Sequence, residues 1–162
     1  TTLFRSAVVL EQASPEDINE LIELRLAYLR DDFGELSEQD RVALPLEIRP
    51  YLQEHLGRDL RVFVAREEGA ICCCAWLLLV EKPPSPRFPH GRTGVLFNVY
   101  TRPKRRRQGL ARGVMRCLID AARDHALDVI ELHATDDGYP LYTSLGFADD
   151  SSTHRAMRMM LS

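Results

Sequence analysis

The stretch from Val95 to Gly113 constrains the fold most, because an apolar run passes through a short basic loop into a helical pattern. Val95–Tyr100 is strand-like, and the loop after it contains four consecutive basic residues, 104–107. From Leu110 onward, apolar residues recur at helical spacing. A strand that turns directly into a helix leaves the first N–H groups of that helix unpaired, and these groups attract an anion. The stretch therefore predicts an anion site at a strand–helix junction.

The small residues in this junction favour a phosphate as the anion. Gly109 and Ala111 lack bulk, so a phosphate can approach the backbone, and arginine side chains offer forked hydrogen bonds to its oxygens. The spacing fits neither a P-loop nor a Gly-x-Gly-x-x-Gly dinucleotide motif. The alternative interpretation is an ordinary solvated basic face before a helix.

Two motifs resemble those of a known family. Arg106-x-x-Gly109-x-Ala111 resembles the acyl-CoA signature Arg/Gln-x-x-Gly-x-Gly/Ala of the GNAT superfamily of N-acetyltransferases. About one strand–helix unit downstream, Tyr142-Thr-Ser-Leu-Gly146-Phe147 resembles the family's Tyr-x-x-Leu-Gly-Phe. The resemblance covers residues 95–150 by motif, and upstream it covers mainly the order of elements.

The resemblance implies an α/β (α+β) GNAT fold with a mixed central sheet of about six to seven strands and about four helices. The whole chain, 1–162, is expected to be a single N-acetyltransferase domain. Pro45 and Pro50 should kink or divide the second helix. Hydrophobic patterning places strands at 5–12, 60–66, 70–80, 95–100, 127–134, 147–150 and 155–161, helices at about 15–30, 37–56, 110–125 and 139–145, and a loop at 82–94.

Charge and cysteine usage narrow the class of protein. A net charge of −3 and a pI near 5.9 argue against general nucleic-acid binding. We find no apolar run of about 18 residues and no signal-peptide pattern, and we expect a cytoplasmic protein that spans no membrane. Cys72, Cys73, Cys74 and Cys117 have neither disulfide-framework nor zinc spacing, so no metal is expected. They are typical of small apolar residues in a buried strand of a reducing compartment.

The resemblance also implies where acetyl-CoA, the co-substrate, binds. It is expected between the strands at 95–100 and 129–134, with its pantetheine arm along the first strand and its pyrophosphate on N–H groups of residues 106–112. Thr135 stands where the family often has an asparagine that contacts the pantetheine. The expected binding residues are Phe97, Val99, Thr101, Arg106, Arg107, Gln108, Gly109, Leu110, Ala111, Arg112 and Thr135.

Direct acyl transfer from a thioester to an amine needs a proton donor for the leaving thiolate and a group that accepts the proton of the amine. Tyr142 matches the position that the family uses as general acid. The strand before the signature has Asn98 where many members have a glutamate, so the base is open. The candidates are His133, Glu131 and a water chain through Asn98, while a histidine that merely ends a strand is the alternative for His133.

The acceptor is expected to be a small amine or a peptide or protein amine, walled by the first two helices. Carboxylates there would favour a cationic amine, unless they only form a solvated turn. This wall offers Arg25, Tyr28, Asp31, Asp32 and Glu35. Two other functions remain open: an acyl-CoA-binding module with little catalysis, and a nucleic-acid binder using residues 102–107. A homodimer through the C-terminal strands is also possible, since edge strands there would otherwise be unpaired.

Overall fold

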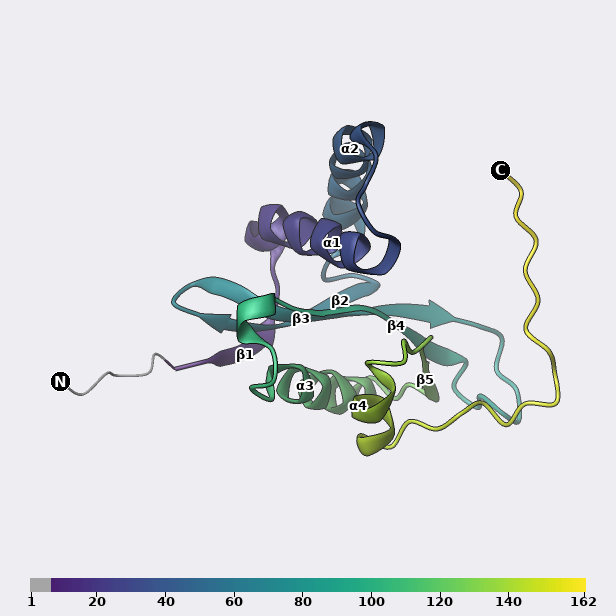
Figure 1. The fold of residues 1–162 in the computed structure, drawn as a ribbon. Helices are drawn as coiled ribbons and strands as arrows, with labels where there is room; N and C mark the ends of the chain where they lie inside the picture. Colours follow the sequence, from purple (N-terminus) through teal and green to yellow (C-terminus); the bar gives the residue numbers. More distant parts are fainter. Residues whose placement is uncertain (1–6) are drawn as a thin grey trace.

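A computed structural model of the chain describes residues 7–162 and contains one mixed sheet of five strands in the order β1-β2-β3-β4-β5 (Figure 1). The pairs β1–β2, β2–β3 and β3–β4 are antiparallel, whereas β4 and β5 are parallel. The strands are β1 (Val9–Gln12), β2 (Leu60–Glu67), β3 (Ala70–Glu81), β4 (Arg92–Thr101) and β5 (Val129–Glu131).

Helices cover both faces of the sheet. One face carries α1 (Ile18–Phe33) and α2 (Glu38–His55), and the other carries α3 (Leu110–Asp124) and α4 (Tyr139–Ser144) (Figure 1). Two short 3₁₀ helices, η1 (Pro15–Asp17) and η2 (Pro103–Arg105), precede α1 and α3. The mixed sheet flanked by four helices confirms the predicted α/β fold.

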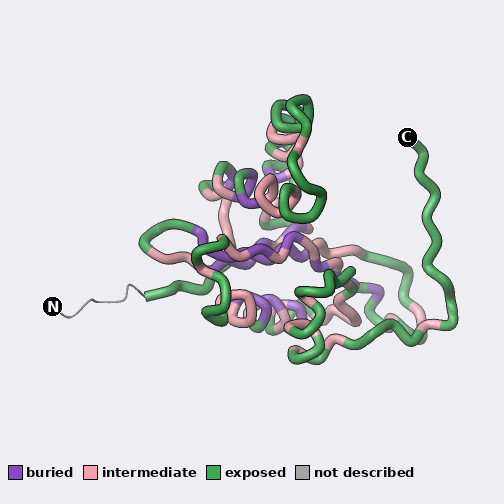
Figure 2. The backbone as a smooth tube through the Cα atoms, in the orientation of Figure 1, coloured by how far each residue is buried: buried purple, intermediate pink, exposed green. Residues whose placement is uncertain are grey.

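The buried side chains form one cluster on each face, with β3 between them (Figure 2). We call these clusters the α1–α2 core and the α3 core. As predicted, β3 is covered on both faces, because seven consecutive residues from Ile71 are buried. Members of the α1–α2 core include Leu21, Leu24, Leu52, Trp76 and Tyr100, and members of the α3 core include Phe63, Leu77, Val114, Met115 and Leu118.

The strand count is five rather than six to seven, because no strand follows α4 in the described chain. The pair predicted at 147–150 and 155–161 is wrong: this segment is mostly exposed and trails away from the sheet (Figure 1). Alternating side chains reveal an extended backbone but not whether another strand is available for pairing. For the same reason, β5 spans only 129–131 of the predicted 127–134, and β4 begins inside the predicted loop, at Arg92. The predicted first strand begins at Val9, and residues 5 and 6 lie outside the described residues.

Of the two predicted effects of the prolines on α2, a kink or a division, the division does not occur. Pro45 and Pro50 lie within one continuous helix, Glu38–His55. Each proline deprives the carbonyl four residues earlier of its N–H donor. Those carbonyls belong to Arg41 and Leu46, which are exposed, so water can replace the missing donors.

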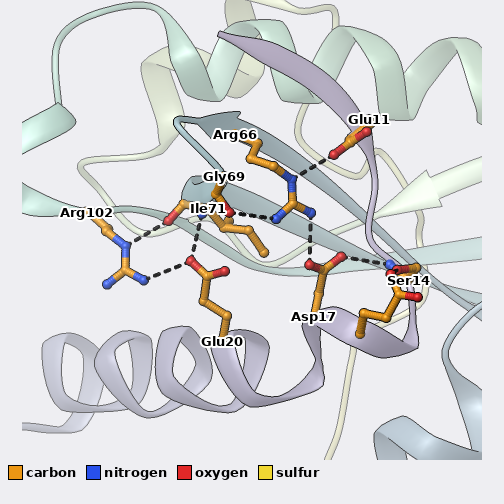
Figure 3. Close-up of polar contacts among 9 residues, drawn as sticks. Glu11, Ser14, Asp17, Glu20, Arg66, Gly69, Ile71 and Arg102 are labelled. Atoms are coloured by element: carbon orange, nitrogen blue, oxygen red, sulfur yellow. Dashed lines mark hydrogen bonds and ion pairs between the residues drawn. The ribbon is translucent and has the colours of Figure 1, made fainter. Parts of the chain in front are cut away.

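A polar network fixes the start of α1 to the sheet edge (Figure 3). Arg66 on β2 donates to Glu11 at 2.7 Å and to Asp17 at 2.9 Å. The Asp17 carboxylate also accepts from the backbone N–H of Ser14 at 2.9 Å. The side chains of Arg66 and Asp17 are only 19% and 12% exposed. Because solvent screens this pair less than a surface pair, it can contribute to stability and set the direction in which α1 crosses the sheet.

Candidate active site

A bulge in β4 shapes the centre of the candidate site. Phe97 faces Trp76 and Tyr100 faces Cys74, so two residues of β4, Asn98 and Val99, stand opposite a single residue of β3. Asn98 takes φ +52°. Asparagine tolerates this left-handed conformation better than most residues. The bulge turns Phe97 and Tyr100 to the α1–α2 core and Val99 to the α3 core.

On the side of β5, β4 has no neighbouring strand after Val95 among the described residues. It pairs with β5 only through Thr93–Val95, so the edge from Leu96 to Thr101 has no strand beside it in the described chain. The unpaired edge can accept an extended ligand arm, and it contains Phe97, Val99 and Thr101, the residues expected to contact the pantetheine. The Thr101 hydroxyl is 3.2 Å from the Cys73 sulfur.

The signature loop begins where this open edge ends. Arg107 and Gly109 have φ +62° and φ +77°, and α3 begins at Leu110 with no side-chain cap. No acceptor for the N–H groups of 107–112 is found among the described residues. Alternating left-handed residues and a free helix start make a concave array of N–H groups that suits a phosphate. A Cβ added at Gly109 would meet nothing within 4 Å, so the space in front of the loop is open.

Arg106, the first residue of the signature, holds the loop to α1. Its Nη2 lies 2.8 Å from Asp31, its Nε donates to the Thr101 carbonyl at 2.9 Å, and its guanidinium lies over the Tyr100 ring. Arg102 similarly holds the end of β4 in place, because its Nε donates to the Ile71 carbonyl of β3 at 2.7 Å (Figure 3).

The remaining basic residues divide into engaged and available groups. Arg105 contacts Glu67 and Gln108, and Arg112 donates to Ser144 on α4 at 2.8 Å. Arg107 is exposed and forms no ion pair or hydrogen bond with the described residues. Of the predicted arginines of the signature, Arg107 is therefore the one whose guanidinium is free to meet an incoming phosphate.

Tyr142 lies on α4, half-buried against the α3 core. Its ring packs edge-on against Phe147, with 5.9 Å between centroids. Burial raises the pKa of Tyr142 to about 12, and Tyr28 and Cys73 add to the rise. A Cβ at Gly138 would come within 2.9 Å of the Tyr142 ring, so this glycine leaves room for it.

The other predicted site residues near β5, His133 and Thr135, are exposed. His133 lies beyond the end of β5, is exposed, and contacts no polar group of the described residues. Thr135 turns toward α4: its hydroxyl accepts from the N–H of Gly138 at 3.1 Å, and its carbonyl accepts from Tyr139. Thr135 therefore orients the helix that carries Tyr142.

On the opposite face, Arg25 reaches from α1 to the bulge. Its Nη1 donates to Asn98 Oδ1 at 3.0 Å, and its guanidinium lies near the Tyr28 and Phe97 rings, 5.7 and 5.8 Å from their centroids. Burial lowers the pKa of Arg25. The other end of the Asn98 amide faces the Cys74 sulfur at 3.7 Å, so the side chain is held at both ends.

A cavity of about 350 Å³ opens beside Arg25, between α1, α2 and β4. The sequence predicted that the first two helices wall the acceptor, and Arg25 and Phe97 were among the predicted site residues. The lining residues of α2 and β3 were missed, because no local motif marks residues that meet only in the fold. Of the predicted acidic wall, Asp31 is paired with Arg106 and none lines the cavity. The cavity is lined by Arg25, Glu47, Ile48, Tyr51, Trp76 and Phe97.

Other parts of the described chain show no second candidate for the functional site. A second hollow, about 240 Å³, lies at the start of β4 and contains none of the predicted site residues. Within residues 7–162, no group of three or more His, Cys, Asp and Glu side chains is placed to hold a metal ion. The helices of this part of the chain are too short or too polar to cross a membrane.

Comparison with known proteins identifies the family to which this open strand edge and free helix start belong. Residues 19–147 match the model of the acetyltransferase (GNAT) family. Since this match covers more than half of the chain, the protein belongs to the GNAT acetyltransferase family, as predicted. No curated protein matches the sequence.

Solved structures of similar fold support the assignment. A predicted acetyltransferase from Clostridium acetobutylicum, crystallised with acetyl-CoA, is 26% identical with a TM-score of 0.80, over 93% of this chain and 96% of that chain. A GCN5-related N-acetyltransferase from Ralstonia eutropha JMP134 is 22% identical with a TM-score of 0.78, over 93% and 99%. A ribosomal-protein-alanine N-acetyltransferase from Brucella melitensis biovar Abortus 2308 is 21% identical with a TM-score of 0.70, over 95% and 100%. The latter two show the shared fold alone.

Proposed function

We propose that the protein is an acetyl-CoA-dependent N-acetyltransferase that transfers the acetyl group to a primary amine by direct attack. The observation that carries the proposal is the set of unpaired N–H groups at 107–112, directly after the open edge of β4. The pyrophosphate would take the N–H groups and the free guanidinium of Arg107. The pantetheine would lie along Phe97, Val99 and Thr101.

The chemistry requires one bond to form and one to break. The amine nitrogen attacks the thioester carbonyl, the carbon–sulfur bond breaks, and the departing thiolate takes a proton. Tyr142 suits the role of donor, because a phenol with a pKa of about 12 is protonated at neutral pH. No covalent enzyme intermediate is needed.

The amine must also lose a proton before it can attack. The exposure of His133 supports transfer to solvent more than to a shielded base. Since the Asn98 side chain is held by Arg25 and Cys74, its support for a water chain would come from the backbone of the bulge. We therefore assign Asn98 to positioning.

We extend the proposal to the whole chain, 1–162, acting as one domain in the cytoplasm. The pairing of β1 with β2 supports this extent, because β1 lies outside the family match. The four cysteines are free thiols, which suits a reducing compartment. A homodimer stays a prediction, and the predicted C-terminal strands cannot supply its sheet edge, because the edge strands in the described chain are β1 and β5.

Calorimetric titration with acetyl-CoA tests the proposal. We expect binding in the micromolar range, about −8 kcal/mol, and its loss in Gly109→Glu, where a carboxylate would occupy the phosphate position. Gly57→Glu is the matched control, since Gly57 has φ +82° and equally open space but lies between α2 and β2. Equal binding by both variants would refute the placement, and no heat from the native protein would refute the transferase.

A further inference from the structure

Arg25 is half-buried, yet no carboxylate lies within 4 Å of it in the described part of the chain. Arg66, Arg102 and Arg106 each have such a partner. The hydrogen bond from Arg25 to Asn98 uses one of five N–H donors and goes to a neutral amide. A half-buried guanidinium with donors to spare, beside a cavity, is suited to bind an anion.

The rest of the cavity indicates what else the ligand carries. Ile48, Tyr51, Trp76 and Phe97 give it an apolar and aromatic wall, and the exposed Glu47 adds one negative charge. Trp76 Nε1 is buried and makes no hydrogen bond of ordinary geometry with the described residues. The volume of the cavity is about 350 Å³. A space of this size is typical of a small-molecule site.

We propose that this cavity binds the acceptor amine through a carboxylate on Arg25, so that the substrate class is a free amino acid with an apolar side chain. This assignment rests on the proposed acetyltransferase function. The planar carboxylate matches the guanidinium fork, the aromatic wall takes the side chain, and Glu47 makes the cavity suit a zwitterion rather than a simple anion. The Asp32 carboxylate attracts Arg25 electrostatically but lies beyond ion-pair distance, so it does not occupy the N–H donors of the guanidinium.

The position of Arg25 connects this cavity to the reaction. Arg25 holds Asn98, the bulge residue at the open edge where the thioester arm is expected. An α-amine lies one carbon away from its carboxylate, so a carboxylate on Arg25 keeps the amine close to that edge. A polyamine would instead place a second cation against Arg25, which like-charge repulsion disfavours.

Trp76 is the only tryptophan in the chain, so its fluorescence reports occupancy of the cavity independently of catalysis. We would titrate the protein, with and without CoA, using two matched pairs: leucine against 3-methylbutylamine, and phenylalanine against phenethylamine. We expect each amino acid to bind about tenfold or more tightly than its decarboxylated partner, as for a hydrogen-bonded charge. Equal binding, preference for the amine, or no change in emission with any of the four would overturn the proposal.

Variants of Arg25 separate charge recognition from structure. Arg25→Met keeps an apolar contact with Phe97 and removes the charge, and it should abolish the preference within each pair. Arg25→Lys should retain part of it. If Arg25 only supported the bulge, Arg25→Met would weaken both members of a pair equally, which would overturn the proposal.

Failure of this inference is distinguishable from failure of the proposed function. Binding of acetyl-CoA with acetylation of amines that lack a carboxylate would refute the amino-acid assignment and leave the transferase standing. A preference for amino acids without any binding of acetyl-CoA would refute the transferase, and the cavity would remain an amino-acid site.

Discussion

Replacing Tyr142 by phenylalanine separates a chemical role of the phenol from a structural one. The hydroxyl makes no hydrogen bond with the described residues, whereas the ring packs on Phe147. Phenylalanine keeps the ring contact and removes a polar atom that burial disfavours. We therefore expect the free energy of unfolding to change by less than about 0.5 kcal/mol, and the affinity for acetyl-CoA to be unchanged.

Turnover should behave differently. Loss of a positioned general acid lowers rates by about 10²- to 10⁴-fold, or about 2.7–5.4 kcal/mol of barrier. The pKa of Tyr142 also fixes the pH dependence. An acid works while it is protonated, and a pKa raised to about 12 keeps this phenol protonated well above neutral pH. The native enzyme should therefore show no loss of turnover from Tyr142 up to about pH 10.

The assay is release of CoA thiol with an accepted amine, followed across pH for native protein and variant. Tyr139→Phe is the matched control, because Tyr139 also lies on α4 but is exposed and donates to Asp149 at 3.2 Å. It should keep native turnover. Full activity in Tyr142→Phe would refute the general-acid role, and an alkaline fall near pH 9 that the variant abolishes would contradict the raised pKa of Tyr142.

Three carboxylates yield further predictions about stability. Asp17→Ala leaves Arg66 without its most shielded acceptor, and it should lower the free energy of unfolding by about 2 kcal/mol. By the same denaturant titration, Glu11→Ala, at the exposed end of this network, should lower it by under about 1 kcal/mol. Desolvation raises the pKa of Asp128, but hydrogen bonds from His90 and from the Arg92 N–H outweigh it, so the pKa is lowered overall. Asp128→Asn should therefore be less stable than native protein at neutral pH, and thermal melts should converge as pH falls below about 4; parallel pH curves would contradict this.

Local signals predicted the surroundings of the signature loop. The free start of α3 and the short helix that carries Tyr142 each depend on a few neighbouring residues, and the sequence contains all of them. The two sequence motifs also gave the family. Local patterning likewise identified β3 as doubly covered.

Features that depend on distant partners were not predictable in the same way. Arg25 and Asn98 are 73 residues apart, and no periodicity indicates that they meet. The bulge arises because β4 has two residues, and β3 only one, between the pairs Trp76–Phe97 and Cys74–Tyr100. Neither strand shows this difference in its own sequence. The C-terminal segment has a strand-like pattern but gains no partner, so pattern alone overestimated the sheet.

The strand β4 can serve both proposed binding sites. The pairing of β4 with β5 ends at Val95, where β5 itself ends, and this leaves open the edge proposed for the pantetheine. Three residues further along the same strand, the bulge presents the Asn98 amide to Arg25 on the opposite face. Arg25 then holds the bulge while its remaining donors face the cavity. A ligand on Arg25 and an acyl group along the β4 edge would therefore share one short piece of backbone, which is the arrangement that direct transfer between them requires.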